Sequence, residues 1–359
     1  MIGTVTLSTV ALAVVTAVSG GFVAVGGVID ALGDGLQFVG DVMCLAGDAA
    51  GLDMLCYSFM QQAFVAGICV GLVAPLVGSF LVHRDMAFIG DTLAHSAFAG
   101  VAVGLFVGSI SSVSVSPYLT ALVVAVIAAL SIDLIAEYTD AYGDVPMAIV
   151  LSGGFALGTV LVSLTDGGIA VSISQYLFGS LSTVTLDNAV ILVLLTVVVT
   201  GVVAATYKQL LFVTFDETAA RVARLNVTLY NRLLVVLTAL VVVAAMQIMG
   251  VILVAAMLVV PVAAAAQVAH SFKGSVVFSI LVGELAVLVG LTLSYFYGVA
   301  AGGTIVIVAI GLYACAVVLD RLGATDALRS GGVETDGGLD GSEAFAVDGG
   351  EESESGAHD

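Results

Sequence analysis

Ten apolar stretches, each long enough to cross a lipid bilayer, leave this chain few possible folds. A membrane-spanning helix needs about 20 mostly apolar residues. The sequence predicts helices near residues 4–28, 59–82, 86–108, 116–136, 146–164, 186–206, 232–248, 250–269, 275–297 and 303–319. Only 10% of the 359 residues are charged, against about a quarter in soluble domains, which excludes a soluble enzyme and a disordered chain. We therefore predict an all-α polytopic membrane protein.

The basic residues predict the orientation of these helices, because Lys and Arg collect in cytoplasmic loops. With ten alternating crossings, all eight fall on one side: Arg84, Lys208, Arg221, Arg224, Arg232, Lys273, Arg321 and Arg329. We therefore expect a plasma-membrane protein with both termini in the cytoplasm. The chain has 27 acidic and only 8 basic residues, which excludes a nucleic-acid partner because phosphate binding needs a basic surface. The acidic excess is typical of a halophile, in which salt screens the repulsion between acidic groups.

Three segments are expected. Residues 1–54 form an extra N-terminal transmembrane helix and most of an acidic outer loop, 30–58, and residues 55–320 form the main membrane domain. Residues 321–359 form a disordered acidic cytoplasmic tail, because they bury too little apolar surface to fold. Cys44 and Cys56 lie in the outer loop and can pair, but two free thiols is the interpretation that we favour.

Asp91 and His95 are the clearest candidates for a functional site. An ionisable side chain inside a span costs roughly 3 kcal/mol, so it indicates function. These two residues are one helical turn apart and should project from one face. A carboxylate and an imidazole together suit Zn²⁺, Mn²⁺ or Fe²⁺. The alternative is that they pair with each other, or with Arg84, and so hold helices together.

Two further acidic residues fall within predicted spans. Glu284, near the middle of helix 275–297, is either a proton or metal relay or an interhelical partner for a hydroxyl or Gln247. We favour the structural role. Asp133, near the inner end of helix 116–136, is expected to reach the interface beside Glu137 and Asp140.

A polar segment, residues 207–232, interrupts the apolar pattern. Thr214 is the predicted N-cap of a short helix, with Glu217 as its capping-box partner. Asp216 then lies in the first turn and Arg221 toward the end, as the helix dipole favours. Asn226 is the predicted stop. Such a helix is suited to docking a partner, although a solvated connector is the simpler interpretation of this segment alone.

Five segments, in this order, resemble the zinc/manganese-type ABC transporter permeases, the membrane subunits of divalent-metal importers. They are Phe-Met-Gln-Gln-Ala at 59–63, Arg-Asp-Met-Ala-Phe-Ile-Gly-Asp-Thr-Leu-Ala-His-Ser at 84–96, Tyr-Leu-Phe-Gly at 176–179, Phe-Asp-Glu at 215–217, and Gly-Val-Ile-Leu-Val-Ala-Ala-Met-Leu-Val-Val-Pro at 250–261. The Gly-Asp-x-Leu-x-His segment is the most specific of these. The chain departs from the family at residues 1–54 and lacks histidine in the loop between the fifth and sixth helices.

The resemblance implies an ABC importer permease bundle that forms a homodimer in the membrane lipid. It implies two partners, an ABC ATPase subunit and an extracytoplasmic metal-binding protein. Asp91 and His95 match the metal path of the family. The coupling helix, which contacts the ATPase, matches Thr214–Asn226 and includes Thr214, Phe215, Asp216, Glu217 and Arg221. The chain has no P-loop, so ATP hydrolysis must come from the partner. No cofactor is expected to be bound permanently.

Other classes of function would require different features of the sequence. An ion-gradient-driven secondary transporter would use Asp91, His95 and Glu284 as a proton relay and would need no ATPase. An intramembrane enzyme would need a fuller catalytic set than one Asp–His pair. Among ABC importers, the vitamin and siderophore type is not expected to have this pair in its third helix. The sequence does not choose between zinc, manganese and ferrous iron, which oxygen and nitrogen ligands all suit.

Overall fold

The computed structural model describes residues 26–51, 53–110, 116–139, 144–164, 176–179 and 185–322. Every regular element in these ranges is helical. In chain order they are α2 (Gly26–Ala50), η1 (Asp53–Cys56), α3 (Ser58–Val82), α4 (Ile89–Ile110), α5 (Pro117–Thr139), α6 (Val145–Ser163), α8 (Leu186–Phe215), α9 (Glu217–Val222), α10 (Val227–Met249), α11 (Val251–Val268), α12 (Phe272–Tyr297) and α13 (Ala301–Arg321).

Most of these helices form one bundle of membrane-spanning length. Eight described helices are long and apolar enough to cross a membrane, namely α3, α4, α5, α6, α8, α10, α12 and α13. α11 carries a shorter apolar stretch, Leu253–Val268. The all-α polytopic fold is confirmed, and the expected ten helices are roughly consistent with it. The expected helix at 4–28 and the tail beyond residue 322 lie almost entirely outside the described residues.

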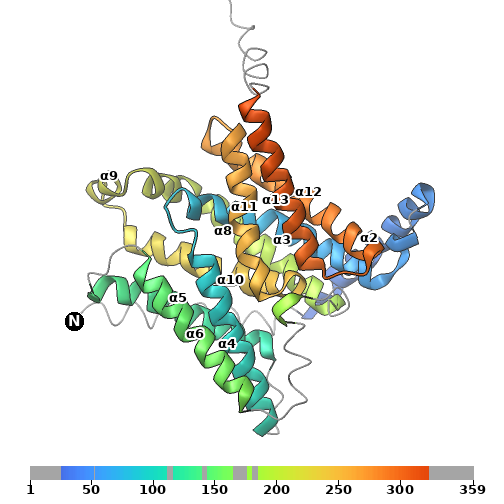
Figure 1. The fold of residues 1–359 in the computed structure, drawn as a ribbon, viewed down its shortest axis with the longest axis horizontal. Helices are drawn as coiled ribbons and strands as arrows, with labels where there is room; N and C mark the ends of the chain where they lie inside the picture. The colour runs from blue at the N-terminus through green and yellow to red at the C-terminus, as the bar shows by residue number, and fades with distance from the viewer. Residues whose placement is uncertain are drawn as a thin grey trace, which may run out of the picture.

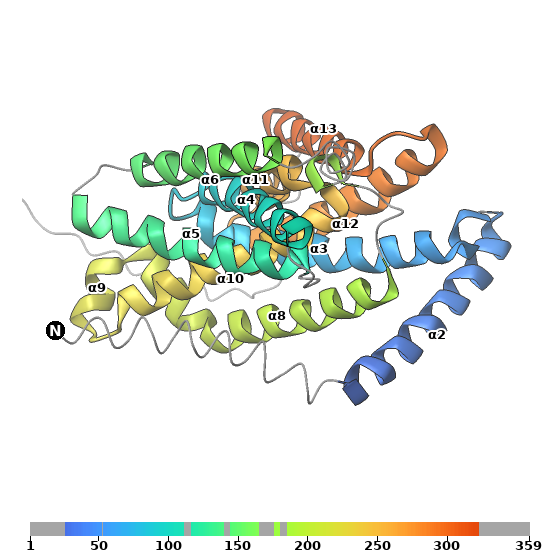
Figure 2. The same ribbon diagram turned by 90° about the horizontal axis from the view of Figure 1, so that it is seen from below.

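The centre of the bundle is α3, which packs against α8, α10, α11 and α12 (Figures 1 and 2). Glycines allow this close packing, because they let the backbones of neighbouring helices approach each other. A methyl group at Gly78 would overlap the carbonyl oxygen of Leu258 in α11. A methyl group at Gly67 would lie 2.6 Å from a side-chain carbon of Val287 in α12.

A second layer, made of α4, α5 and α6, lies beside this centre (Figure 1). Here too the helices approach at small residues. A methyl group at Gly100 of α4 would lie 2.5 Å from the Cα atom of Ala121 in α5, and one at Gly158 of α6 would lie 2.6 Å from the ring of Phe98 in α4. The faces of α4 that contact α5 and α6 are therefore tightly packed. This packing fixes how α4 is rotated about its axis, and so which way its remaining face points.

The bundle has a basic end, which α9 marks in Figure 2. Arg84, just after α3, donates a hydrogen bond to Asn231 in the first turns of α10. The ring of Phe215, at the end of α8, lies 5.6 Å from that of Phe272, the first residue of α12. α13 runs back along α12, so Arg321 at its end returns to the same side. α2 lies at the opposite end (Figure 2).

The prediction of a loop over residues 30–58 is wrong, because this segment forms α2 and η1. The helix buries Gly40 and Gly47, while Asp34, Asp41 and Asp48 are exposed. Those aspartates are seven residues apart, so one face of a helix can carry them all. Acidic residues at that spacing therefore do not break a helix.

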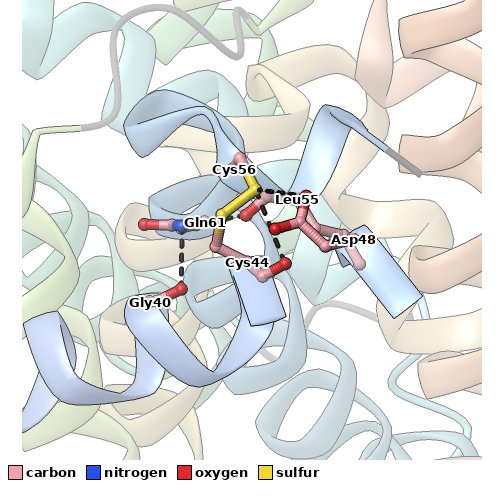
Figure 3. The surroundings of a disulfide bond; sticks show 6 residues. All are labelled: Gly40, Cys44, Asp48, Leu55, Cys56 and Gln61. Carbon is pink, nitrogen blue, oxygen red and sulfur yellow. Dashed lines mark hydrogen bonds between the residues drawn. A yellow bond between two sulfur atoms is a disulfide. The ribbon is translucent and has the colours of Figure 1, made fainter. Parts of the chain in front are cut away.

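The interpretation of Cys44 and Cys56 as free thiols is also wrong. They form a disulfide that joins α2 to the end of η1 (Figure 3). The two residues come together because α2 turns back at Gly51, which has φ +68°, and η1 then packs against the helix. Among the described residues, Cys69 and Cys315 are free.

A break between two helices, expected around Gly250, is present. Gly250 ends α10 and starts α11, and its φ of +77° favours glycine. A methyl group there would overlap the carbonyl oxygen of Leu177. The family motif at residues 176–179 therefore packs directly on the junction of α10 and α11.

We predict that Gly250→Ala lowers the free energy of unfolding by about 1–3 kcal/mol, through backbone strain and the clash with Leu177. Thermal unfolding of the detergent-solubilised protein measures the change. Gly201→Ala, in α8, is the matched control, because nothing lies within 4 Å of its added methyl group. Equal melting temperatures for the two variants would contradict this account of the junction.

Candidate metal site and coupling surface

Asp91 and His95 lie in the first two turns of α4, close to the basic end of the bundle. Nδ1 of His95 lies 3.3 Å from Oδ1 of Asp91 and 3.0 Å from its backbone oxygen. The expected shared face is confirmed. Because Asp91 occupies the first turn, the N-terminal end of the helix dipole also stabilises its carboxylate.

These contacts decide which imidazole nitrogen remains available. Nδ1 of His95 faces two oxygens of Asp91, so it is the nitrogen that carries a proton in the neutral ring. Nε2 then has a free lone pair and can bind a metal ion. Asp91 can orient the ring in this way or offer its own carboxylate oxygen as a second ligand.

In the described part of the chain, the face of α4 that carries the pair is left partly exposed. The His95 side chain is 21% exposed and that of Asp91 is 36% exposed. The ring of Phe155, on α6, meets the imidazole edge to face at 5.4 Å and is itself 45% exposed. A charged pair facing hydrocarbon is costly, so this surface requires protein or water against it.

Arg84 does not pair with Asp91 and His95, contrary to one of the two structural alternatives. Its guanidinium donates to Asn231 of α10, and its Nη1 is buried with no hydrogen-bond partner among the described residues. Burial lowers the pKa of Arg84, and the negative charge of Glu217 opposes that change. Arg84, in the turn before α4, therefore links that turn to the segment that carries α9. The other structural alternative, mutual pairing of Asp91 and His95, is the arrangement observed.

Glu284 lies apart from this pair, on α12. Its carboxyl group packs against α3, where a methyl group at Gly71 would lie 3.2 Å from its Cδ. This position between two helices agrees with a structural role. The side chain of Gln247, the partner considered from the sequence, lies outside the described residues.

Asp133 makes an ion pair that sequence reasoning missed. Its Oδ2 accepts a hydrogen bond from Nε of Arg232 at 2.6 Å, which joins α5 to the start of α10. The sequence predicts only that Asp133 lies near the inner end of its helix and that Arg232 lies on the basic, cytoplasmic side. Their pairing depends on α5 and α10 being neighbours, and no spacing along the chain indicates that.

The predicted short helix after α8 is present as α9, but its cap differs from the prediction. α8 continues to Phe215, so Thr214 is helical and its hydroxyl donates to Leu210 O at 2.7 Å. The N-cap is Asp216, whose Oδ1 accepts from the Ala219 N–H at 2.8 Å. Glu217 pairs with Arg221 across one turn, and both are exposed. The prediction failed because α8 is longer than its apolar stretch.

The prediction that Asn226 ends α9 is wrong. α9 ends at Val222, and the side chain of Asn226 caps the next helix, α10, by accepting from the Leu229 N–H at 3.2 Å. Between them Arg224 has φ +60°. α9 is thus a short helix of six residues between two long helices at the basic end; Ala220 is buried, while Glu217 and Arg221 are exposed.

We predict that Asp216→Ala speeds amide hydrogen exchange in residues 217–222, because removing a helix N-cap costs about 1 kcal/mol. Hydrogen exchange followed by mass spectrometry measures this. Thr214→Val is the control and should leave exchange in α9 unchanged. Faster exchange in the Thr214 variant alone would show that Thr214, and not Asp216, is the N-cap of α9.

One further group of metal-binding side chains occurs in the described part of the chain. Cys44, Asp48 and Cys56 place one donor atom each within 4.8 Å of one another. The two sulfur atoms are bonded together, so the group is not a thiolate site in this state. α2, which carries Cys44 and Asp48, lies at the end of the bundle opposite to α9 (Figure 2).

Known proteins share this architecture and these motifs. Residues 56–320 match the ABC 3 transport family. The manganese transport system membrane protein MntC of Listeria monocytogenes is 31% identical over 253 residues, which cover 70% of this chain and 88% of that protein. The high-affinity zinc uptake system membrane protein ZnuB of Haemophilus influenzae is 30% identical and covers 70% of this chain and 94% of that protein.

Solved structures agree with these matches. PsaBC from Streptococcus pneumoniae, in complex with Fab, superposes with a TM-score of 0.66 at 32% identity, covering 76% of this chain and 95% of that chain. An inward-facing metal-chelate type ABC transporter superposes with a TM-score of 0.58 at 16% identity, which shows the fold alone.

The bundle of membrane-spanning helices, together with the family match over residues 56–320, defines a membrane subunit of an ABC transporter. Its relatives carry manganese and zinc transport in their names. The chain belongs to the ABC 3 transport family and is a metal ABC transporter permease of the zinc/manganese type. The family resemblance seen in the sequence motifs is confirmed.

Proposed function

We propose that this chain is the permease of an ATP-driven importer of divalent metal ions: zinc, manganese or ferrous iron. The observation that carries the proposal is the Asp91–His95 pair on α4. One imidazole nitrogen and one carboxylate are too few ligands for a closed metal site. Incomplete ligation suits a transporter, because the ion must leave as readily as it enters.

A homodimer would complete both the surface and the site. The exposed face formed by Asp91, His95 and Phe155 needs covering, and a second copy of the same face supplies two more ligands. In a twofold dimer the same patch meets itself across the axis. The metal path would then run along this axis, between the two α4 helices.

The basic end would face the cytoplasm, where Lys and Arg are favoured. Residues Thr214–Asn226, with α9 exposed between Asp216 and Arg221, would contact a separate ABC ATPase subunit there. The opposite end would receive the ion from an extracytoplasmic metal-binding protein. Both termini would then be cytoplasmic, in a plasma-membrane protein.

Contacts at the basic end offer a route from the ATPase to the metal pair. Arg84 contacts Asn231 of α10, is influenced by the charge of Glu217 in α9, and lies in the turn that leads into α4. Asp85 in that turn has φ +56°, a strained conformation for a residue other than glycine. Movement of α9 on ATP binding would therefore reach the first turn of α4, which holds Asp91.

We predict that Asp91→Asn and His95→Gln each reduce metal uptake by cells by about tenfold or more, because each removes a ligand or the group that orients it. Uptake of Zn²⁺ and Mn²⁺ is compared at equal amounts of membrane-inserted protein. Asp41→Asn, an exposed carboxylate on α2, is the control and should transport normally. Unchanged uptake in the Asp91 variant would contradict the metal-site assignment.

We predict that Phe155→Cys forms a disulfide between two protomers, because this residue lies beside His95 on the proposed dimer face. The experiment uses membranes, with Cys69 and Cys315 changed to serine, and non-reducing electrophoresis. Leu285→Cys is the control, since Leu285 is 47% exposed on α12, outside that face. Cross-linking through Leu285 in place of Phe155 would assign the dimer to another surface.

A further inference from the structure

The cluster Cys44, Asp48 and Cys56 has the ligand chemistry of a metal site and lies away from the Asp91–His95 pair. Asp48 follows Cys44 by one turn of α2, and Cys56 ends η1 (Figure 3). One donor atom of each lies within 4.8 Å of the others. Cys44 and Asp48 precede residues 56–320, so they lie outside the part of the chain that matches the family.

These side chains can be reached from the solvent. Asp48 is exposed, and neither cysteine is fully buried. Sγ of Cys56 lies 3.8 Å from Oδ1 of Asp48 (Figure 3). In the disulfide this sulfur has no proton to donate, so the carboxylate gains no hydrogen bond from it. In the oxidised state the Asp48 carboxylate therefore lies near both sulfur atoms without forming a hydrogen bond to either.

Contacts other than the disulfide hold the cluster together. Nε2 of Gln61, in α3, donates to Gly40 O of α2 at 2.9 Å and to Leu55 O of η1 at 2.8 Å (Figure 3). A methyl group at Gly40 would lie 2.5 Å from the Gln61 side chain, and Met54 of η1 is buried. Reduction of the disulfide would therefore leave the three donors close together, which lowers the entropic cost of binding an ion.

We propose that Cys44, Asp48 and Cys56 form a redox-gated zinc site. A thiol reductant supplies two electrons and two protons, so the disulfide becomes two thiols and the reductant becomes a disulfide. Zn²⁺ then displaces both thiol protons and binds two thiolates and one carboxylate, with water as the fourth ligand. Thiolates favour Zn²⁺ over Mn²⁺, which prefers oxygen ligands. In the reverse direction a small-molecule disulfide accepts the two electrons and becomes two thiolates, so the Cys44–Cys56 disulfide re-forms and Zn²⁺ is released.

Co²⁺ is a suitable probe, because cobalt bound to thiolates absorbs strongly in the near ultraviolet. The full-length protein, with Cys69 and Cys315 changed to serine, is reduced, freed of reductant without air and titrated with Co²⁺. We expect thiolate absorption that saturates at one ion per protomer and disappears when Zn²⁺ is added. The oxidised protein should show none. This assay measures binding alone, so its outcome is independent of transport through Asp91 and His95.

Matched variants test each part of the proposal. Asp48→Asn and Gln61→Ala should each weaken Co²⁺ binding by about tenfold or more, since one removes a ligand and the other its support. Asp41→Asn, two turns earlier on α2, should bind normally. In the reduced wild-type protein, Zn²⁺ should protect Cys44 and Cys56 from alkylation and leave Cys315 reactive. This second measurement does not depend on the folding of any variant.

Three results would overturn the proposal. The first is a reduced protein that gives no thiolate absorption and no protection from alkylation. The second is absorption that persists in Cys44→Ser, because the metal would then be bound elsewhere. The third is unchanged affinity in Asp48→Asn, which would leave a pair of thiols without the carboxylate ligand.

Discussion

The cost of holding ionisable side chains inside a membrane governs how this chain is built. Asp91 and His95 lie on a membrane-spanning helix, where each would cost roughly 3 kcal/mol without compensation. The structure reduces that cost in two ways: the side chains are 3.3 Å apart, and Asp91 lies at the positive end of the α4 dipole. Neither contact covers their exposed face. A second protomer against that face would supply the covering that the described residues of one chain do not provide.

The remaining faces of α4 are packed at small residues, which gives the pair a fixed direction. Gly100 meets the backbone of α5, Gly158 of α6 meets Phe98, and Gly90 faces Leu258 of α11. A helix held on three sides gives Asp91 and His95 little freedom, and in the proposed metal site two ligands per protomer would keep binding weak. The turn before α4 carries Arg84, which bonds to Asn231 of α10 and is influenced by the charge of Glu217 in α9. In the proposed mechanism this helix end would connect the Asp91–His95 pair to α9. The tight packing of α4 and the proposed ligation and coupling would thus involve the same few residues.

Sequence reasoning predicted the helices well where burial depends only on apolar length, and it placed Asp91 and His95 on one face because helical spacing is local. It failed where tertiary contacts decide. The aspartates of α2 predict a loop, but this segment is a helix that contacts with η1 and Gln61 stabilise. Thr214 was read as a cap because α8 extends beyond its apolar stretch. The pairs Asp133–Arg232 and Cys44–Cys56 join elements whose proximity no spacing along the chain reveals.

The most direct test of the account is metal uptake by vesicles reconstituted with this chain, with and without its ATPase subunit and ATP. Zn²⁺, Mn²⁺ and Fe²⁺ are measured in parallel, so the experiment also identifies the ion. The account predicts uptake that requires both the ATPase and ATP hydrolysis. Uptake by the chain alone, driven by a proton or salt gradient, would contradict it and would make residues 214–226 a simple connector.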